Sequence, residues 1–312
     1  MDGVEAVAAP LLIAIVGPTA AGKSALALRL ARETGGEIVS CDSLQVYRGL
    51  DIGSAKPTRD ELLQAPHHLI DVVDPDQGFT AAEYARRARQ ALAEIRARGR
   101  RPLVVGGSGL YLRALLSGLF EGPSRDEALR RRLERLAGRF GDARLHGLLR
   151  RVDPEAAARI EVRDRLRVVR ALEVFRATGR SLSQHHRAGA EPLAGFEVRL
   201  LGLSPPREVL RAAVERRTDA MLAGGLLEET RALLARYPPD LPPLRAIGYR
   251  QAMAVVRGEQ EVAAARRDMV KETMRYAKRQ MTWFRHQAQV SWCATSEEAH
   301  ARASAWLASP RP

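Results

Sequence analysis

An α/β fold built on a parallel sheet is predicted by three observations. Short apolar runs alternate with helix-patterned stretches over the first 120 or so residues. A glycine-rich loop joins the first apolar run to the first helical pattern, and polar or glycine-rich residues follow other runs. Such alternation indicates parallel strands connected by helices on both faces of the sheet. The predicted class is a P-loop NTPase-like parallel sheet flanked by helices, with a helical insertion domain.

The strands are expected at the short apolar runs, as in buried parallel strands. The first of these runs is followed by a helical pattern at residues 24–32, and further helices are expected at 81–98 and 110–116. Ligands of such sheets bind at the carboxyl ends of the strands, so the residues directly after each strand form the expected site. The expected strands are residues 11–16, 37–41, 69–73, 103–105 and 196–203.

The character of the chain changes at Pro123. Residues 126–180 are rich in arginine and carry leucine and valine at helical spacing, without a strand-like apolar run. A catalytic core of residues 1–122 plus 196–312 is therefore expected, with residues 123–195 as the helical insertion. Helices are also expected at 207–237 and 261–287, on either side of a proline-rich break.

The loop at residues 17–24 reads G-P-T-A-A-G-K-S, which is a complete G-x-x-x-x-G-K-S motif between a strand and a helix. Its backbone N–H groups point inward at the positive end of the helix and can hold a phosphate or diphosphate. Lys23 adds a positive charge, and the Ser24 hydroxyl can ligate Mg²⁺. A glycine-rich turn without a ligand is the alternative. The expected diphosphate-binding residues are Gly17, Pro18, Thr19, Ala20, Ala21, Gly22, Lys23 and Ser24.

Asp42 follows the second predicted strand directly, at the same edge of the sheet as the loop. In small-molecule kinases of this architecture, a carboxylate near this place often takes a proton from the attacking nucleophile. The alternative is an aspartate that only caps the turn with Ser43. A magnesium-binding carboxylate is missing after residues 102–105, where glycines stand instead, although Asp71 or Asp74 could substitute. This pattern favours a diphosphate other than that of ATP.

The chain carries 50 basic and 37 acidic residues, for a formal net charge of +13 at pH 7. Such an excess favours a polyanionic partner, nucleic acid ahead of a membrane, although arginine-rich genome composition is an alternative source. On a helix over residues 261–287, one face presents Lys271, Arg275, Lys278 and Arg285 beside Thr282, and an apolar stripe lies about 100° away. We expect this face to bind a polyanion rather than to be only solvated.

Several other classes of protein are excluded by the sequence. Cys41 and Cys293 lie far apart without a C-x-x-C spacing, so neither a disulfide framework nor a zinc site is expected. The histidine pairs 67–68 and 185–186 lack the spacing of a metal site. The apolar run 11–16 is far too short to span a bilayer. A soluble cytoplasmic protein without a membrane partner is therefore expected.

Together these landmarks resemble the tRNA dimethylallyltransferases, also called the tRNA isopentenyltransferase family. The resemblance covers roughly residues 11–293, and most of its motifs are specific to that family. Besides the phosphate loop, the matching segments are S-C-D-S-L-Q-V-Y at 40–47, L-D-I-G-S-A-K-P at 50–57, P-H-H-L-I-D at 66–71, V-G-G-S-G-L-Y at 105–111, R-A-L-E-V at 170–174, A-I-G-Y-R-Q at 246–251 and Y-A-K-R-Q-M-T-W-F-R at 276–285.

The resemblance implies transfer of a dimethylallyl group from dimethylallyl diphosphate to N6 of adenine 37, beside the anticodon of a tRNA. The loop would hold the donor diphosphate with Mg²⁺, and Lys23 would neutralise the leaving group. Asp42 would accept the N6 proton. Ser108 stands where the family often has threonine and would orient the amine or the leaving group. The catalytic residues implied are Asp42, Ser108 and Lys23, and a monomer is expected.

The target adenine must leave its stack to reach a buried donor. The resemblance therefore also implies contacts to the tRNA anticodon stem-loop. Two alternatives remain: Arg170 could pair with Glu173, and the pair 248–249 could be a turn with a packing ring. An ATP-dependent small-molecule kinase and a nucleotide-gated RNA-binding module are the rival functions. The implied tRNA-binding residues are Asp42, Ser43, Leu44, Gln45, Ser108, Arg130, Leu166, Arg167, Arg170, Arg245, Gly248, Tyr249, Arg250, Lys278, Arg279 and Arg285.

Overall fold

The computed structural model describes residues 9–120, 122–123, 126–187 and 191–308. Its contacts divide the chain into two compact units, residues 1–116 with 193–312 and residues 117–192. The second unit runs from residue 117 to residue 192, whereas the insertion was expected at 123–195. Each unit is described by itself.

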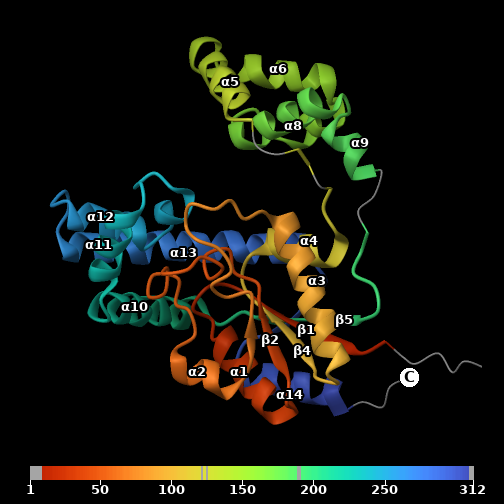
Figure 1. Cartoon of the computed structure of the whole chain (residues 1–312), viewed down its shortest axis with the longest axis vertical. Coiled ribbons are helices and arrows are strands. Elements are labelled where there is room, and N and C mark those ends of the chain that lie inside the picture. Colours follow the sequence, from red (N-terminus) through yellow and green to blue (C-terminus); the bar gives the residue numbers. More distant parts are fainter. Residues whose placement is uncertain (1–8, 121, 124–125, 188–190, 309–312) are drawn as a thin grey trace, which may run out of the picture. The chain divides into compact units, whose positions relative to one another are not determined.

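Within its described residues, the first unit holds a six-stranded parallel sheet in the order β3-β2-β4-β1-β5-β6 (Figure 1). The strands β2, β4 and β1 are neighbours in this order, so the loops that follow them meet at one edge. This sheet, covered by helices, confirms the predicted fold class. The strands are β1 Leu11–Val16, β2 Glu37–Ser40, β3 His67–His68, β4 Pro102–Val105, β5 Glu197–Leu203 and β6 Ser291–Cys293.

The prediction of a strand at residues 69–73 is wrong. The paired residues there are His67 and His68, and the next residues bend away, because Leu69 and Asp71 have φ values of 63° and 55°. The apolar pattern that suggested a strand arises because Val73 packs in a separate core and forms only an isolated bridge with Tyr47. Strand β6 was not predicted, since three residues are too short to show a pattern.

Alternate side chains of β1 enter different cores. Leu12 and Ala14 pack with α3 (Ala81–Ala97), α4 (Gly109–Ser117) and α13 (Val262–Gln287). Ile13 and Ile15 pack with α1 (Lys23–Thr34) and α14 (Ser296–Ala308). A strand that is buried on both faces reads as a continuous apolar run, which explains why β1 was found from the sequence.

A third core lies beside the sheet and builds one wall of the site. It joins the segment after β2 to the helices α10 (Arg207–Ala223), α11 (Leu226–Arg236) and α12 (Tyr249–Val256) and the 3₁₀ turn η1 (Pro242–Arg245). Met269 of α13 closes it. The short helix α2 (Arg59–Gln64) begins after this segment, capped by Thr58.

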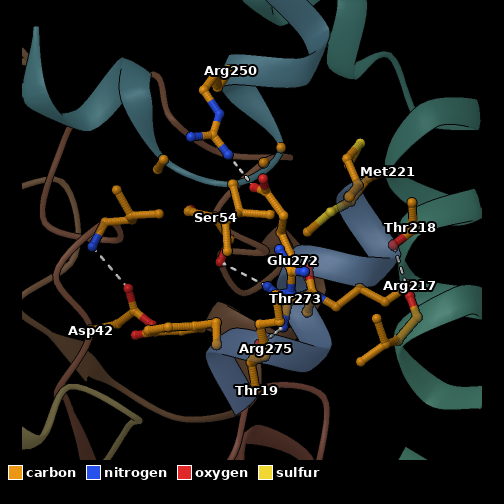
Figure 2. Close-up of a pocket in the computed structure, with 18 of the residues that line it drawn as sticks. Thr19, Asp42, Ser54, Arg217, Thr218, Met221, Arg250, Glu272, Thr273 and Arg275 are labelled. Atoms are coloured by element: carbon orange, nitrogen blue, oxygen red, sulfur yellow. Dashed lines mark hydrogen bonds and ion pairs between the residues drawn. The ribbon is translucent and has the colours of Figure 1, made fainter. Parts of the chain in front are cut away.

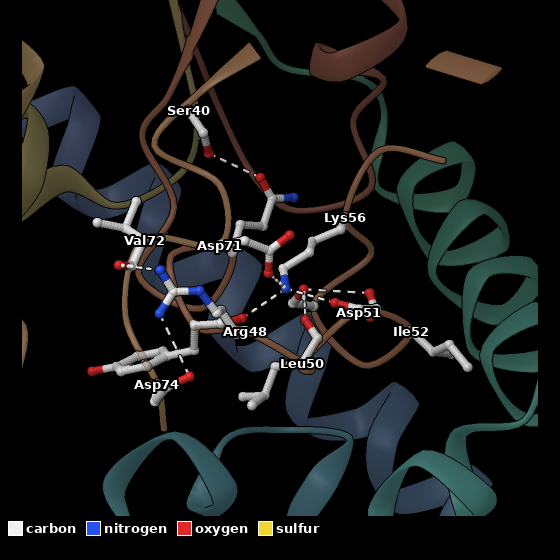
Figure 3. A network of polar contacts seen from close by, with 12 residues as sticks. Ser40, Arg48, Leu50, Asp51, Ile52, Lys56, Asp71, Val72 and Asp74 are labelled. Carbon is white, nitrogen blue, oxygen red and sulfur yellow. Dashed lines mark hydrogen bonds and ion pairs between the residues drawn. The ribbon is translucent and has the colours of Figure 1, made fainter. Parts of the chain in front are cut away.

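The long connection between β2 and β3 is fixed by polar contacts (Figure 3). Lys56 is almost completely buried, and its Nζ donates at 2.6 Å to the Tyr47 carbonyl and to the carboxylates of Asp51 and Asp71. Arg48 pairs with Asp74 at 3.5 Å. Because Lys56 and Arg48 engage them, Asp71 and Asp74 do not act as free magnesium ligands.

Glu229 on α11 holds the same connection from the other side. Its carboxylate accepts the backbone N–H groups of Asp51, Ile52 and Gly53 at 2.8–3.2 Å and the Tyr249 hydroxyl at 2.6 Å. Burial raises the pKa of Tyr249, with the nearby charge of Glu229 adding to it. One carboxylate therefore satisfies four donors and ties a loop to two helices.

The second unit is helical over its described residues, in agreement with the sequence. Aspartates 126, 153 and 164 cap α5, α7 and α8 by accepting a backbone N–H of the first turn. Leucines and valines of the facing helices form its core. Its helices are α5 Glu127–Phe140, α6 Asp142–Val152, α7 Pro154–Arg159, α8 Arg165–Thr178 and α9 Leu182–Arg187.

Replacing Glu229 by alanine is expected to lower the free energy of unfolding by about 3 kcal/mol, because buried donors lose a charged acceptor. Urea denaturation followed by circular dichroism measures this change. Glu228→Ala is the matched control, since the Glu228 side chain is 68% exposed, and its effect is expected to stay within about 0.5 kcal/mol. Similar effects of the two changes would contradict the role assigned to Glu229.

Candidate functional site

The loops that follow β1, β2 and β4 form one site. Asp42 and Ser43 follow β2, and Ser108 follows β4. The backbone N–H of Ser43 donates to the Ser108 Oγ at 3.1 Å, and the N–H of Ser108 donates to the Cys41 carbonyl at 3.2 Å. The structure thus brings Asp42 and Ser108 together, as the sequence predicted.

The phosphate loop lies between β1 and α1. Gly17 has a φ of 134°, and a Cβ there would lie 2.5 Å from the Leu203 carbonyl, so the turn out of the strand requires glycine. Helix α1 begins at Lys23, whose Nζ donates to the Pro18 carbonyl at 2.6 Å. This side chain therefore spans the loop whose N–H groups would face an anion.

Arg217 on α10 is a second cation at this loop, and the sequence analysis missed it. Its guanidinium donates to the Thr19 Oγ1 at 2.9 Å and to the Ser54 carbonyl at 3.4 Å (Figure 2). The available signal was its position, since Val214, Thr218 and Met221 occupy the same inward helical face. Because a buried charge is costly unless it is paired, a cation on an inward face indicates an anionic partner.

Burial disfavours the charged form of both cations. The pKa of Lys23 is lowered to about 8, mainly by burial and in addition by the charge of Arg217. Burial also lowers the pKa of Arg217, while the charge of Asp42 acts in the opposite direction. A bound diphosphate would supply the negative charge that this pair lacks.

Asp42 caps the turn that follows β2, which is the alternative role considered for it, and the cap uses one of its two carboxylate oxygens. Its Oδ1 accepts the backbone N–H groups of Leu44 at 2.8 Å and Gln45 at 3.4 Å, which is a turn cap. Among the described residues, no hydrogen bond involves its Oδ2, and Asp42 lines the pocket beside the loop. One oxygen therefore orients the carboxylate, and the other is available to a substrate.

These groups open into a cavity of about 560 Å³ (Figure 2). Thr19 and Asp42 lie at its polar end. Side chains of α10 and α13, among them Val214, Met221 and Met269, form an apolar part. The cavity has room for a short hydrocarbon chain beside a diphosphate. Its cationic lining consists of Arg217, Arg245, Arg250, Arg275 and Arg279.

The cationic face predicted on the long helix is present on α13. Lys271, Arg275, Lys278 and Arg285 are exposed together with Thr282. The predicted apolar stripe is buried at Val270, Ala277 and Phe284 and half-buried at Met274 and Met281. Among the implied tRNA-binding residues, this leaves Lys278, Arg279 and Arg285 accessible on one helix.

Three implied tRNA-binding residues have internal roles in the first unit. The Tyr249 ring is completely buried in the third core, so the prediction that it contacts tRNA is wrong for its side chain. Gly248 is also buried and has a φ of 99° before α12, and it lines the cavity beside the phosphate loop. The Gln45 amide links the Ser40 hydroxyl to the Ala55 carbonyl. The alternative of a turn with a packing ring describes residues 248–249 correctly.

Among the other implied residues of the first unit, several line the pocket, namely Asp42, Ser43, Leu44, Arg245, Arg250 and Arg279. The described lining of this pocket does not include Ser108, Lys278 or Arg285. Leu44 lies next to Ser43 at its wall, and Arg245 is exposed. Arg250 forms an ion pair with Glu272, whose carboxylate also accepts the Gln251 amide at 2.9 Å. The pocket therefore brings residues from six elements or loops into one place, as the resemblance implied for most of them.

In the second unit, Arg130 and Arg170 both bind the fully buried Glu173, at 2.8 Å and 2.6 Å. Burial opposes ionisation of this carboxyl, but the two guanidinium groups outweigh it and lower its pKa to about 2. The pairing of Arg170 with Glu173 is thus present. Leu166 is 76% exposed and Arg167 is also exposed, so these two are accessible on the surface of α8.

A magnesium site made of protein carboxylates is not found in the described part of the chain, where no cluster of three or more metal-ligating side chains occurs. Ser24 is exposed in the first turn of α1, next to the loop. Magnesium often takes one protein oxygen, several waters and substrate phosphates. The donor set therefore fits an ion carried mainly by the diphosphate.

Cys41 and Cys293 are buried and free. His68 binds Glu37 at 2.7 Å, and His185 stacks on Phe120 with ring centres 3.7 Å apart. Over the part of the chain that the structure describes, no helix has the length and apolar character needed to cross a membrane.

Comparison with protein families matches the chain to the IPP transferase model over residues 45–287. The chain belongs to the IPP transferase family. It is 50% identical to a tRNA dimethylallyltransferase of Anaeromyxobacter sp. (strain K) over 301 residues, covering 96% of this chain and 98% of that protein. It is also 50% identical to a tRNA dimethylallyltransferase of Myxococcus xanthus, covering 93% and 94%. The resemblance found in the sequence is thereby confirmed.

Solved structures of the family agree with this assignment. The full-length tRNA isopentenylpyrophosphate transferase of Bacillus halodurans is 38% identical, with a TM-score of 0.69 and coverage of 95% of this chain and 96% of that one. A eukaryotic dimethylallyltransferase acting on tRNA is 25% identical, with a TM-score of 0.76 and coverage of 97% and 82%. The fold is therefore that of the family along nearly the whole chain.

The affinity for inorganic diphosphate is expected to fall as the pH rises through about 8, because Lys23 loses its proton in the free protein. The sign follows from the lowered pKa: below about 8 the ammonium is charged and attracts the anion. Isothermal titration calorimetry between about pH 7 and 9.5 measures this fall, which approaches about tenfold per pH unit.

Lys23→Arg is the control, since a guanidinium stays charged throughout this range. Titration of diphosphate itself affects both proteins equally, so the ratio of their affinities isolates Lys23. A ratio that does not change with pH would rule out the titration of Lys23 as its cause.

Proposed function

We propose that this protein transfers the dimethylallyl group of dimethylallyl diphosphate to N6 of adenine 37 of a tRNA, next to the anticodon. The products are N6-isopentenyladenosine and diphosphate. The observation that carries the proposal is the composition of one cavity. It combines Thr19 of the phosphate loop, the Arg217 guanidinium and an available carboxylate oxygen of Asp42 with apolar side chains and further arginines. Lys23 belongs to the same loop. The family membership supports the same reaction.

The leaving diphosphate would lie at the loop. As the bond between C1 of the allyl group and the diphosphate oxygen breaks, negative charge grows on that oxygen. Lys23 and Arg217 already contact this loop, so stabilising the charge needs little rearrangement of these two side chains. The Lys23 ammonium would exchange its bond to the Pro18 carbonyl for one to the diphosphate.

Asp42 would act on the nucleophile. The lone pair of N6 forms the new bond to C1, and N6 then loses one proton. The Oδ2 of Asp42 is available to accept it, while Oδ1 stays fixed by the turn. Ser108, whose Oγ accepts the Ser43 N–H, retains its own hydroxyl proton for the amine or the diphosphate.

Magnesium is proposed as the cofactor, because a diphosphate binds with less repulsion as a magnesium complex. Ser24 would hold the ion from the protein side, together with donor oxygens. When bound, the ion supplies positive charge to the leaving group.

The tRNA is proposed to bind through the exposed cations of α13 and the arginines around the cavity, with Leu166 and Arg167 of the second unit as further contacts. Phosphate contacts give affinity without sequence choice, and the base must enter the cavity to reach Asp42. We also infer that the protein acts as a monomer in the cytoplasm, where tRNA is found.

An ATP-dependent kinase is the alternative. It would use the same loop and Asp42, but it leaves the apolar wall and the cationic face of α13 without a purpose. It would also lack the acidic magnesium ligand that follows a strand in phosphoryl-transfer enzymes, since β4 is followed by glycines. A purely RNA-binding module would leave the oriented carboxylate of Asp42 unused.

The direct experiment is incubation of the protein with Mg²⁺, unmodified tRNA and dimethylallyl diphosphate labelled in the allyl carbons. Digestion to nucleosides then locates the label. The proposal expects labelled adenosine from the position 3′ of the anticodon, and none from a tRNA with guanosine there. Absence of transfer, together with consumption of ATP in the presence of nucleosides, would favour the kinase.

Asp42→Asn is expected to lower the single-turnover transfer rate by about 10²–10⁴-fold, because the amide cannot accept the N6 proton. The asparagine oxygen can still accept the Leu44 N–H, so the turn is preserved. Filter binding should give an unchanged affinity for tRNA. A rate close to that of the unmodified protein would exclude Asp42 as the base.

Arg285→Ala is expected to reduce the slope of log K against log salt concentration for tRNA binding by about one unit, because one phosphate contact is lost. Arg29→Ala is the matched control, since Arg29 is exposed on α1 and pairs with Glu33. Equal slopes for the two variants would remove Arg285 from the interface.

A further inference from the structure

Gln280 connects the phosphate loop, which would bind the donor diphosphate, to the turn that carries Ser108, which would lie near the amine. It lies on α13, and only 6% of it is exposed. Its Oε1 accepts the backbone N–H of Thr19 in the phosphate loop at 2.9 Å. Its Nε2 donates to the Gly107 carbonyl, in the turn that carries Ser108, at 2.9 Å. These contacts join segments that are 261 and 173 residues away in the chain.

The fit around this amide is close. A Cβ on Gly107 would lie 2.1 Å from the Gln280 Nε2, so the turn approaches the helix as near as glycine allows. Thr19 is meanwhile held from its other side, because Arg217 donates to its hydroxyl. The N–H of Thr19 is thus used by the protein, which leaves anion binding to the loop residues that follow it.

We propose that Gln280 is a positioning residue, which fixes the diphosphate loop relative to the Ser108 turn and so sets the distance between the leaving group and the groups around the amine. The inference rests on the proposed function. It adds a role for the buried side of α13, whose exposed side presents Lys278, Arg279 and Arg285.

Among the natural neutral side chains of this length, only glutamine can accept a hydrogen bond from Thr19 and also donate one to Gly107. It offers an acceptor to Thr19 and a donor to Gly107 from one planar group. Methionine has a similar length but cannot make either bond. Ionised glutamate can accept from Thr19 but would bring a negative oxygen against the Gly107 carbonyl. Protonated glutamate restores the pattern, because its hydroxyl can donate and its carbonyl can accept.

Gln280→Met tests the positioning role by single-turnover transfer at saturating tRNA and donor. The first-order rate constant is expected to fall about 10–100-fold, as for a small misplacement of reacting groups, while the dissociation constant for tRNA changes less than about twofold. The rate constant does not depend on how much protein is folded, so a merely structural role would lower the amplitude instead. Gln90→Met is the matched control, since Gln90 is exposed on α3.

Gln280→Glu gives a second test with a pH-dependent signature. Burial raises the pKa of a carboxyl group, so this glutamate gains its proton within reach of the assay. The ratio of its rate constant to that of the unmodified protein is expected to rise as the pH falls from about 8.5 to 5.5. Rescue at low pH would also show that the fold tolerates the change.

The outcomes separate the two proposals. If the unmodified protein transfers no dimethylallyl group, the proposed function fails. If it transfers the group, but Gln280→Met keeps its rate constant within about twofold, the positioning role is overturned. A ratio for Gln280→Glu that does not vary with pH would overturn it as well, whether or not the methionine variant folds.

Discussion

The arrangement of the site depends on two like charges that the fold holds beside an anion-binding loop. Lys23 and Arg217 come from α1 and α10, and each is disfavoured in its charged form by burial. The carboxylate of Asp42, which lines the same cavity, favours the charged form of both cations. The pair of cations therefore favours binding of an anion, and a diphosphate fits it in charge.

The surrounding structure keeps this unfavourable arrangement in place. Glu229 and Lys56 fix the connection that carries Ser54, and Ser54 in turn accepts from Arg217. The phosphate loop is held by Arg217 on one side and Gln280 on the other. Such networks of satisfied buried groups can stabilise a strained site, because the stability is supplied elsewhere in the fold. The same helices that close the cavity also present its cations.

Much of this organisation was predictable from local patterns. The phosphate loop, Asp42, Ser108 and the cationic face of α13 were recognised because motifs and helical periodicity are visible over short windows. Arg217, Gln280 and Glu229 were missed, since each acts on residues more than 160 positions away. Residues 69–73 misled because the side chains of Val72 and Val73 pack in a separate core. Tyr249 was assigned to tRNA because its motif was matched, whereas its ring is buried in the third core and its hydroxyl donates to Glu229.

The most direct test of the account compares the binding of two magnesium complexes, those of dimethylallyl diphosphate and ATP, by isothermal titration calorimetry on the unmodified protein. If the cavity is built for a diphosphate attached to a short hydrocarbon, the allylic diphosphate should bind at least about tenfold more tightly than ATP. Arg217→Ala should reduce that preference. Tighter binding of ATP, or its hydrolysis during the titration, would contradict the account.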